Sequence, residues 1–471
     1  MGKIWNLEDY NGKTALVDEY GKSMTYEALD AESNKLTEIM GHRALVFALC
    51  RNEIGSVLGY TAFINNGIVP VMVNSHLEEN LLENLLNTYK PEFLWIPKDQ
   101  MAQFAGMSME YEAYDYALLK TGYDVKYPLY DELGLLITTS GSTGSPKLVR
   151  QSYTNVLDNA KSIVEYLKID AEERPITTLP MNYVYGLSII NSHFLVGATL
   201  LLTDKGLMQK EFWNFFKEQR ATSFGGVPYT YEMLERLRFF RMDLPSLRTM
   251  TQAGGKITPE IHEKFARYAA KHGKNFVVMY GAAEATARMG YLPPEKAVEK
   301  CGSMGIPIPG GKFRLIGSDG QEVTDPHITG ELVYEGKNVT LGYAECGDDL
   351  AKGDERNGRL ETGDMAQFDE DGYYYIVGRK KRFLKIFGNR VNLDEIDRMI
   401  KGQYEIEVAS SGVDDHMFIF MTEEKYAETV RDFVISKTKL NPTAFKVIVI
   451  DEIPKNESGK TLYKELTRYY E

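Results

Sequence analysis

Residues 135–147 read Leu-Leu-Ile-Thr-Thr-Ser-Gly-Ser-Thr-Gly-Ser-Pro-Lys, and no other stretch of the chain is as informative. We expect the apolar run to form a buried strand that leads into a loop of hydroxyls and glycines and ends at Lys147. Glycines let several N–H groups turn toward one anion, while hydroxyls add donors and the lysine adds positive charge. The spacing differs from the common phosphate loop G-x-x-x-x-G-K-[ST], because Pro146 stands five residues after Gly141. These residues alone leave both a phosphate-binding loop and a flexible surface turn open.

The bulk composition limits the classes of function. A chain of 471 residues has room for two to four domains, and its 43% hydrophobic and 26% charged residues are typical of a globular protein. The formal charge of -13 argues against nonspecific binding to nucleic acid or to an anionic membrane surface. We therefore expect no nucleic-acid partner, although a nucleotide is still possible because a small local cluster of donors is enough to hold one phosphate group.

The cysteines and the apolar runs predict a location. Cys50, Cys301 and Cys346 are too scattered for a zinc site or a disulfide framework, which fits a reducing compartment. The N-terminus lacks the apolar core of a signal peptide, and no apolar run is long enough to cross a bilayer. We expect a cytoplasmic protein without a membrane span and with free thiols in or near its cores.

Hydrophobic patterns predict strands alternating with helices over the first 300 residues. Strands are expected at 14–17, 44–49 and 69–73, and a helix at 26–40. Thr258-Pro259 is a favourable helix start, with a hydroxyl N-cap before a proline at the first helical position. This alternation predicts an α/β fold with mainly parallel sheets.

The pattern changes after about residue 300. Prolines and glycines there separate short strands, which predicts a small β-rich subdomain. A hairpin near 372–377 leads into the basic run Arg379-Lys380-Lys381-Arg382, followed by about ninety residues, enough for a small α+β domain. The run is open to interpretation as a hinge, a nucleic-acid patch or a solvated turn, although its shortness and the acidic chain disfavour nucleic acid.

Several other clusters have residue types suited to a nucleotide. Tyr280-Gly281-Ala282-Ala283-Glu284 follows an expected strand, where an aromatic ring can stack on a base and a carboxylate can hold Mg²⁺. Ala253-Gly254-Gly255 lets a flat group approach the backbone. Thr362-Gly363-Asp364, expected in a loop, offers a carboxylate to sugar hydroxyls. Each cluster alone is equally compatible with an ordinary turn.

A lysine near the C-terminus has two interpretations. Lys460 ends the polar stretch Pro454-Lys455-Asn456-Glu457-Ser458-Gly459-Lys460. Lysine is usually solvated, so this one fits an exposed tail. It also fits a charge that a moving domain carries into an active site.

The order and spacing of these clusters resemble the adenylate-forming superfamily, which includes acyl-CoA synthetases, the adenylation domains of peptide synthetases and firefly luciferase. The resemblance runs from Thr14-Ala15-Leu16-Val17 through Gly330-Glu331-Leu332 and Gly378-Arg379 to Ser458-Gly459-Lys460. It implies a large N-terminal domain of αβ-layered sheets over 1–380, with a β-rich subdomain from about 300. A small, mobile α+β lid domain is implied over 381–471, with its hinge at Lys381.

The resemblance implies a reaction in two halves. A small-molecule carboxylate attacks the α-phosphate of Mg-ATP, giving an acyl-adenylate and pyrophosphate. The thiol of CoA then takes the acyl group; alternatively the acceptor is the phosphopantetheine arm of an acyl or peptidyl carrier protein. A different class also stays open, a nucleotide-binding relative without catalytic activity.

The resemblance assigns roles residue by residue. Lys460 matches the lysine that bridges carboxylate and α-phosphate, Glu284 the magnesium ligand, and Lys385 a catalytic residue of the second half-reaction. Gly388 matches the place where a pantetheine arm passes. The matched nucleotide-binding residues are, in the loop, Thr139, Ser140, Gly141, Ser142, Thr143, Gly144 and Lys147, and elsewhere Gly254, Gly255, Tyr280 (on adenine), Gly281, Asp364 and Arg379 (on ribose).

The acyl pocket is expected near Tyr183, Tyr185 and Gly186. The family often has His where this chain has Tyr183. Amino-acid-activating domains place an Asp in this region, and 180–187 contains none, so the resemblance favours a carboxylate without an α-amino group. Two further residues depart from the family pattern, Leu148 in place of Gly and Ala283 in place of Thr.

Overall fold

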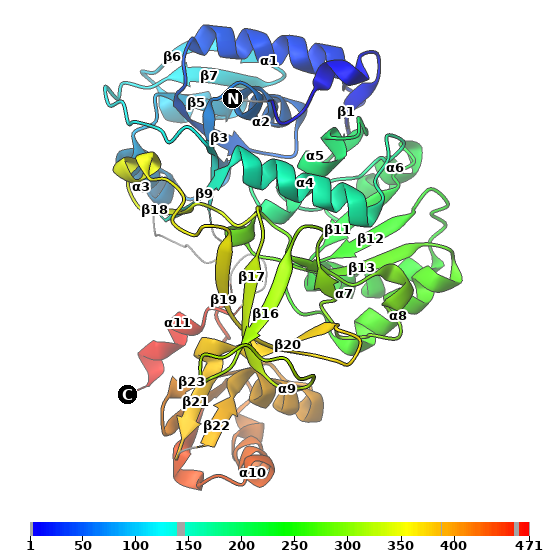
Figure 1. The fold of residues 1–471 in the computed structure, drawn as a ribbon, viewed down its shortest axis with the longest axis vertical. Coiled ribbons are helices and arrows are strands. Elements are labelled where there is room, and N and C mark those ends of the chain that lie inside the picture. The colour runs from blue at the N-terminus through cyan, green and yellow to red at the C-terminus, as the bar shows by residue number, and fades with distance from the viewer. Residues whose placement is uncertain (1–2, 139–146, 388, 456–460, 471) are drawn as a thin grey trace. The chain divides into compact units, whose positions relative to one another are not determined.

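The structure is a computed structural model that describes residues 3–138, 147–387, 389–455 and 461–470, without the side chain of Arg390. Its contacts divide the chain into two compact units. The first unit comprises Met1–Phe313 and Tyr334–Leu360, and the second comprises Arg314–Val333 and Glu361–Glu471 (Figure 1). Each unit is described by itself.

An eight-stranded sheet dominates the N-terminal half of the first unit. Its strands lie in the order β18 (Gly342–Ala344), β9 (Leu148–Ser152), β8 (Leu133–Thr138), β4 (Val69–Asn74), β3 (Leu45–Cys50), β5 (Phe93–Pro97), β7 (Tyr116–Lys120) and β6 (Ser108–Ala113). The central strands β8, β4, β3 and β5 are parallel, whereas the strands toward both edges pair antiparallel. Within this sheet, the expectation of mainly parallel strands is therefore correct for the centre and wrong for the edges.

Two further sheets complete the first unit. One has the order β10 (Leu200–Leu202), β1 (Thr14–Asp18) and β2 (Ser23–Thr25). The other has the order β11 (Ser223–Gly226), β12 (Thr249–Gln252), β13 (Asn275–Tyr280), β14 (Gly290–Tyr291) and β15 (Ile306–Pro307), of which the first three are parallel. The helices of the unit are α1 (Tyr26–Met40), α2 (Ile54–Asn65), α3 (Glu79–Tyr89), α4 (Tyr153–Leu167), α5 (Val184–Phe194), α6 (Lys210–Glu218), α7 (Pro228–Arg236) and α8 (Pro259–Lys271).

The second unit is a smaller α+β body. It contains most of a four-stranded sheet of order β16 (Lys312–Ile316), β17 (Gly330–Glu335), β19 (Arg359–Phe368) and β20 (Tyr374–Arg379). Farther along the chain lie β21 (Phe383–Ile386), β22 (Asn389–Asn392), α9 (Leu393–Tyr404), β23 (Val408–Val413), β24 (His416–Met421), α10 (Ala427–Thr438), β25 (Phe445–Val449) and α11 (Tyr463–Leu466). Leu384, Ile396 and Ile419 belong to the largest apolar core of these elements.

Local signals place several elements correctly. The helix expected at 26–40 is α1, where the Thr25 hydroxyl accepts a hydrogen bond from the Ala28 amide. The helix expected from Thr258-Pro259 is α8, capped by Thr258. Thr362-Gly363-Asp364 is a correction, because these residues lie inside the ten-residue strand β19 rather than in a loop.

Three other expectations have outcomes on the described residues. None of the described helices is long and apolar enough to cross a membrane. Cys50, Cys301 and Cys346 are free, but Cys346 is exposed rather than near a core. The basic run is not simply a solvated turn: Lys381 is exposed, whereas Arg382 is buried.

Candidate functional site

Three parallel strands bring the expected nucleotide-binding clusters to one edge of a sheet. The register pairs Gly226 of β11 with Gln252 of β12, and Gln252 with Val278 of β13. Gly254 and Gly255 follow β12 directly, and Tyr280 ends β13. The carboxyl edge of parallel strands is where open α/β sheets place ligands. The fold therefore brings Gly254, Gly255, Tyr280 and Gly281 to such an edge.

Close backbone packing explains the glycines at this edge. A Cβ on Gly281 would lie 1.6 Å from the Ala287 carbonyl oxygen, so a side chain at 281 would displace the backbone. Gly254 has φ of +81°, in the left-handed region that favours glycine, and a Cβ there would lie 2.7 Å from the Tyr183 hydroxyl. The expected pocket residue Tyr183 is thus next to the expected nucleotide residue Gly254.

The other expected pocket residues have different environments. The Tyr185 ring centroid lies 6.3 Å from that of Tyr183, and the two rings meet edge to face. Tyr185 is buried, and its hydroxyl lies 2.8 Å from the Thr251 hydroxyl on β12. Gly186 packs against the chain before α5, because a Cβ there would lie 2.3 Å from the Pro180 carbonyl oxygen. Gly186 therefore positions the start of α5.

Glu284 is held by residues that the sequence did not single out. Its Oε1 accepts a hydrogen bond of 2.7 Å from the Tyr343 hydroxyl, and its main-chain carbonyl accepts bonds from Thr340 and Arg356 at 3.0 and 3.1 Å. Burial and the adjacent Glu284 carboxylate raise the pKa of Tyr343 to about 12, so Tyr343 stays a donor at neutral pH. Glu284 is therefore fixed through both its backbone and its side chain.

Two cations adjoin the same tyrosine. The Lys147 ammonium lies 3.8 Å from the centroid of the Tyr343 ring, and the Arg356 guanidinium carbon lies 4.7 Å from it. Lys147 also lies 3.7 Å from a carboxylate oxygen of Glu345. We call Glu284, Tyr343, Lys147 and Arg356 the Glu284 cluster. It combines one carboxylate and two cations, groups suited to a metal-bound polyphosphate.

The donor set of this cluster fits Mg²⁺ bound together with phosphates. The described residues contain no group of three or more His, Cys, Asp or Glu side chains placed to hold a metal ion. Mg²⁺ usually keeps several waters and binds through one or two carboxylates plus substrate phosphates, rather than in an all-protein cage. Glu284 offers such a single carboxylate, with Lys147 nearby to balance phosphate charge.

Asp364 and Arg379 lie opposite each other on neighbouring strands of the second unit's sheet. They are opposite residues in the antiparallel register of β19 and β20, and Arg379 Nε lies 2.6 Å from Asp364 Oδ1. Gly363, with φ of +69°, lets β19 bend just before Asp364. Asp364 is 4% exposed and Arg379 is exposed. The structure thus brings together the two residues expected on the ribose.

The segment around the expected hinge contains a buried ion-pair network. Arg382 Nε lies 2.8 Å from Asp394, and its terminal nitrogen lies 2.8 Å from Asp397. Lys381 and Lys385 are exposed, and the Lys385 amide donates to Asp414 at 2.8 Å. Arg382 therefore anchors the end of the basic run, while the described residues form no comparable ion pair with the exposed Lys381.

Leu148 has a structural explanation. It begins β9, is fully buried, and lies opposite Thr138 of β8 and Ala344 of β18. It belongs to an apolar core with Leu136 and Leu350. The leucine therefore closes the core at the base of the loop. Several expected site residues lie outside the described residues: Thr139, Ser140, Gly141, Ser142, Thr143, Gly144, Gly388 and Lys460.

Comparisons with known proteins define the family. A family model described as "AMP-binding enzyme" matches residues 5–344, and the chain belongs to this family. The predicted superfamily is thereby confirmed.

Curated relatives include CoA ligases. Oxalate–CoA ligase of Arabidopsis thaliana is 28% identical over 72% of this chain and 68% of its own length. Indoleacetate–CoA ligase of Aromatoleum aromaticum is 30% identical over 69% of this chain and 65% of its own length. 2-Succinylbenzoate–CoA ligase of Bacillus cereus is 26% identical over 94% of this chain and 95% of its own length. The chain therefore spans about two thirds of the first two and nearly all of the third.

Solved structures confirm the α/β fold expected from the resemblance. O-succinylbenzoate coenzyme A synthetase from Bacillus subtilis, in complex with AMP, superposes with a TM-score of 0.78 at 22% identity, covering 99% of this chain and 98% of that one. ATP-bound MatB from Rhodopseudomonas palustris has a TM-score of 0.77 at 20% identity and covers 99% of both chains.

Proposed function

We propose that the protein is an AMP-forming acid–CoA ligase. A substrate carboxylate oxygen bonds to the α-phosphorus of ATP, and the bond from that phosphorus to the bridging oxygen breaks, releasing pyrophosphate. The CoA sulfur then bonds to the acyl carbon, its proton is released, and AMP leaves with the former carboxylate oxygen. The observation that carries the proposal is the Glu284 cluster in a chain of the AMP-binding enzyme family.

The first half-reaction brings together anions, so it needs charge neutralisation more than covalent help. Glu284, oriented by Tyr343, would hold Mg²⁺ with the phosphates, and Lys147 and Arg356 add positive charge. Bound Mg²⁺ supplies positive charge to the polyphosphate. Lys460 is proposed to bridge the carboxylate and the α-phosphate on the strength of the family resemblance.

The nucleoside-binding residues are proposed on the same resemblance. Tyr280 stacks on adenine, and Gly254, Gly255 and Gly281 lie at the same edge of the sheet as Tyr280. Asp364 accepts hydrogen bonds from the ribose hydroxyls, and Arg379, its partner across β19 and β20, orients the carboxylate.

The second half-reaction is proposed to use a moving lid. Residues 381–471 form the lid, which pivots at the exposed Lys381 and presents Lys385 and Gly388 for thioester formation. CoA is the proposed acceptor, because the relatives named above are CoA ligases. A carrier protein's phosphopantetheine arm offers the same thiol and is the alternative outcome of the test.

Exchange of labelled pyrophosphate into ATP tests the adenylation step. We expect exchange that depends on a carboxylate from a panel of aliphatic, aromatic and amino acids, with amino acids inactive. Glu284→Gln should lower the rate by about 100-fold or more, while Glu335→Gln, which removes a half-buried carboxylate paired with Arg359, should leave it unchanged. If none of the acids supports exchange, the result would favour a nucleotide-binding relative without catalytic activity.

A further inference from the structure

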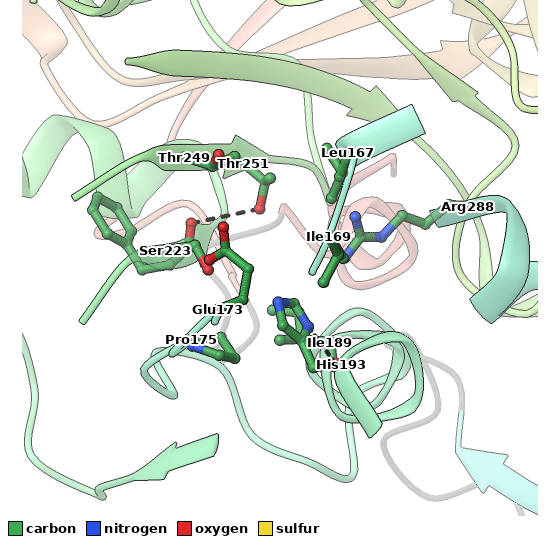
Figure 2. A pocket seen from close by; sticks show the side chains of 11 residues that line it. Leu167, Ile169, Glu173, Pro175, Ile189, His193, Ser223, Thr249, Thr251 and Arg288 are labelled. Atoms are coloured by element: carbon green, nitrogen blue, oxygen red, sulfur yellow. Dashed lines mark hydrogen bonds between the residues drawn. The ribbon is translucent and has the colours of Figure 1, made fainter. Parts of the chain in front are cut away.

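A small cavity lies beside helix α5 and strand β12, and the side chain of Arg288 forms part of its lining (Figure 2). The cavity has about 20 Å³ of room for a water-sized molecule. Its lining includes Ile189 and His193 of α5, Thr249 and Thr251 of β12, and Glu173. Arg288 is 2% exposed.

The partners of Arg288 are all neutral. Its Nε donates to the Ser188 hydroxyl at 3.2 Å, and one terminal nitrogen donates to the Tyr166 hydroxyl at 3.1 Å and lies 2.9 Å from the Met279 sulfur. The guanidinium carbon lies 4.9 Å from the centroid of the Tyr185 ring. Within the described residues, no carboxylate oxygen lies within the 4.0 Å of an ion pair with Arg288.

The other buried arginines are paired with carboxylates. Arg150, fully buried, contacts Glu355 and four backbone carbonyls. Arg382, 8% exposed, pairs with Asp394 and Asp397. Removing a guanidinium from water costs free energy that a neutral hydroxyl only partly returns, so buried charges are normally paired. Arg288 is the exception among the buried arginines of the described part of the chain.

The other ionisable groups that line the cavity do not neutralise the charge of Arg288. A hydroxyl of Thr222 donates to Glu173, whose other carboxylate oxygen lies 3.5 Å from Arg248. Burial lowers the pKa of His193 to about 4, so this imidazole is neutral at pH 7. The positive charge of Arg288 is therefore available to a ligand.

Tyr185 connects this charge to the expected substrate pocket. The Tyr185 ring contacts both the Arg288 guanidinium and the Tyr183 ring. Tyr183 in turn lies next to Gly254. Arg288 thus lies one aromatic side chain beyond the pocket where the proposed function places the acyl group. A short acid that reaches past Tyr185 would bring its far end to the guanidinium.

We propose that Arg288 binds a second anionic group on the carboxylate substrate, so that the protein prefers short acids with a terminal carboxylate or sulfonate. This inference rests on the proposed function and adds the substrate class. A cavity volume of about 20 Å³ holds one or two waters. The space therefore suits one compact anionic group and is too small for an alkyl chain. The hydrogen bonds of Arg288 described above use Nε and one terminal nitrogen, which leaves its other terminal nitrogen to donate to a carboxylate or sulfonate oxygen.

Matched acids test the proposal. Adenylation is measured as kcat/KM for succinate against butyrate and glutarate against pentanoate, with 3-sulfopropionate to separate sulfonate from carboxylate. Wild-type protein should prefer each diacid by about 100-fold or more, and Arg288→Met should lose the preference while still adenylating the monoacid. Arg288→Lys, which keeps the charge but not the guanidinium donor, should retain part of the preference.

Direct binding separates this proposal from the proposed function. Succinate should raise the melting temperature of wild-type protein by several degrees and leave Arg288→Met unchanged. If the protein adenylates monoacids, shows no preference for diacids and is not stabilised by succinate, the role of Arg288 is wrong. The proposed function is then unaffected. If no acid is adenylated, the proposed function fails, and succinate stabilisation alone then decides: its presence supports the anion site, and its absence means that the cavity holds water only.

Discussion

The Tyr343 hydroxyl donates a 2.7 Å hydrogen bond to Oε1 of Glu284, although the two residues are 59 positions apart in the chain. Tyr343 lies on β18, which pairs antiparallel with β9, the strand that begins at Leu148. One aromatic side chain therefore connects the proposed magnesium ligand with Lys147, the last residue of the motif quoted at the outset.

Replacing Tyr343 by Phe should weaken metal-dependent adenylation. The ring remains for Lys147 and Arg356, but the Glu284 carboxylate loses a donor, and a hydrogen bond to a charged group contributes about 1.5–3 kcal/mol. We expect pyrophosphate exchange to fall roughly tenfold or more and to require more Mg²⁺. Tyr10→Phe, which removes a hydroxyl bond to the Leu195 carbonyl, is the control. An unchanged magnesium dependence would show that Tyr343 does not position Glu284.

Arg356 should matter more than its neighbour Arg359. Arg356 donates to the Glu284 carbonyl and to the Thr340 hydroxyl, whereas Arg359 is an exposed residue 3.3 Å from Glu335. Arg356→Ala should lower the adenylation rate by about tenfold, through loss of hydrogen bonds and of nearby positive charge. Arg359→Ala should have little effect, because exposed ion pairs contribute little. Equal effects of the two substitutions on the adenylation rate would contradict this assignment.

Stiffening the proposed hinge should separate the two half-reactions. Lys381 lies in the short 3₁₀ turn Lys380–Arg382, and proline would fix its φ near −65°. Lys381→Pro should reduce thioester formation from a supplied acyl-adenylate more than adenylation, whereas Lys381→Ala should reduce neither. Single-turnover measurements of both steps check this prediction. Equal losses of rate in the two steps would contradict the assignment of Lys381 as the hinge.

Asp349 should make the segment after β18 sensitive to acid. Burial opposes ionisation, but Lys352 and the Glu345 and Cys346 amides outweigh it and lower the pKa of Asp349 to about 2. A carboxyl with a depressed folded pKa stabilises the fold above its unfolded pKa of about 3.9, and this stability is lost as pH falls through the folded value. Asp349→Asn should therefore lower the unfolding free energy by about 1 kcal/mol at pH 7.

The difference between wild type and Asp349→Asn should shrink between pH 4 and pH 2, which urea titrations at pH 7, 4 and 2.5 measure. The adjacent, exposed Asp348 provides the matched Asp348→Asn control. A stability difference for Asp349→Asn that stays constant down to pH 2.5 would contradict the depressed pKa.

Local chemistry explains what the sequence predicts well. Helix 26–40 has its own cap at Thr25, and Glu284 lies in the short turn soon after β13, so neighbouring residues are enough to find both. Thr362-Gly363-Asp364 has the composition of a turn, yet pairing with β20 draws it into β19, and Gly363 absorbs the bend. In that case tertiary pairing outweighs local preference.

Long-range packing explains what the sequence leaves out. Tyr343 and Arg356 have no local motif, because strand pairing and contacts with Glu284 bring them to the site. Leu148 departs from the family pattern for a reason visible only in the core that it fills. Arg288 has no local sequence motif, and its significance depends on its burial without a carboxylate partner among the residues that the structure describes.

The central claim, an AMP-forming ligation of an acid to CoA, is tested most directly by mass spectrometry of the reaction products. The protein is incubated with ATP, Mg²⁺, CoA and the acid that gives the fastest pyrophosphate exchange. We predict equal amounts of AMP, pyrophosphate and acyl-CoA, all dependent on the acid. Formation of ADP and phosphate, or of AMP without a thioester of CoA, would contradict the account.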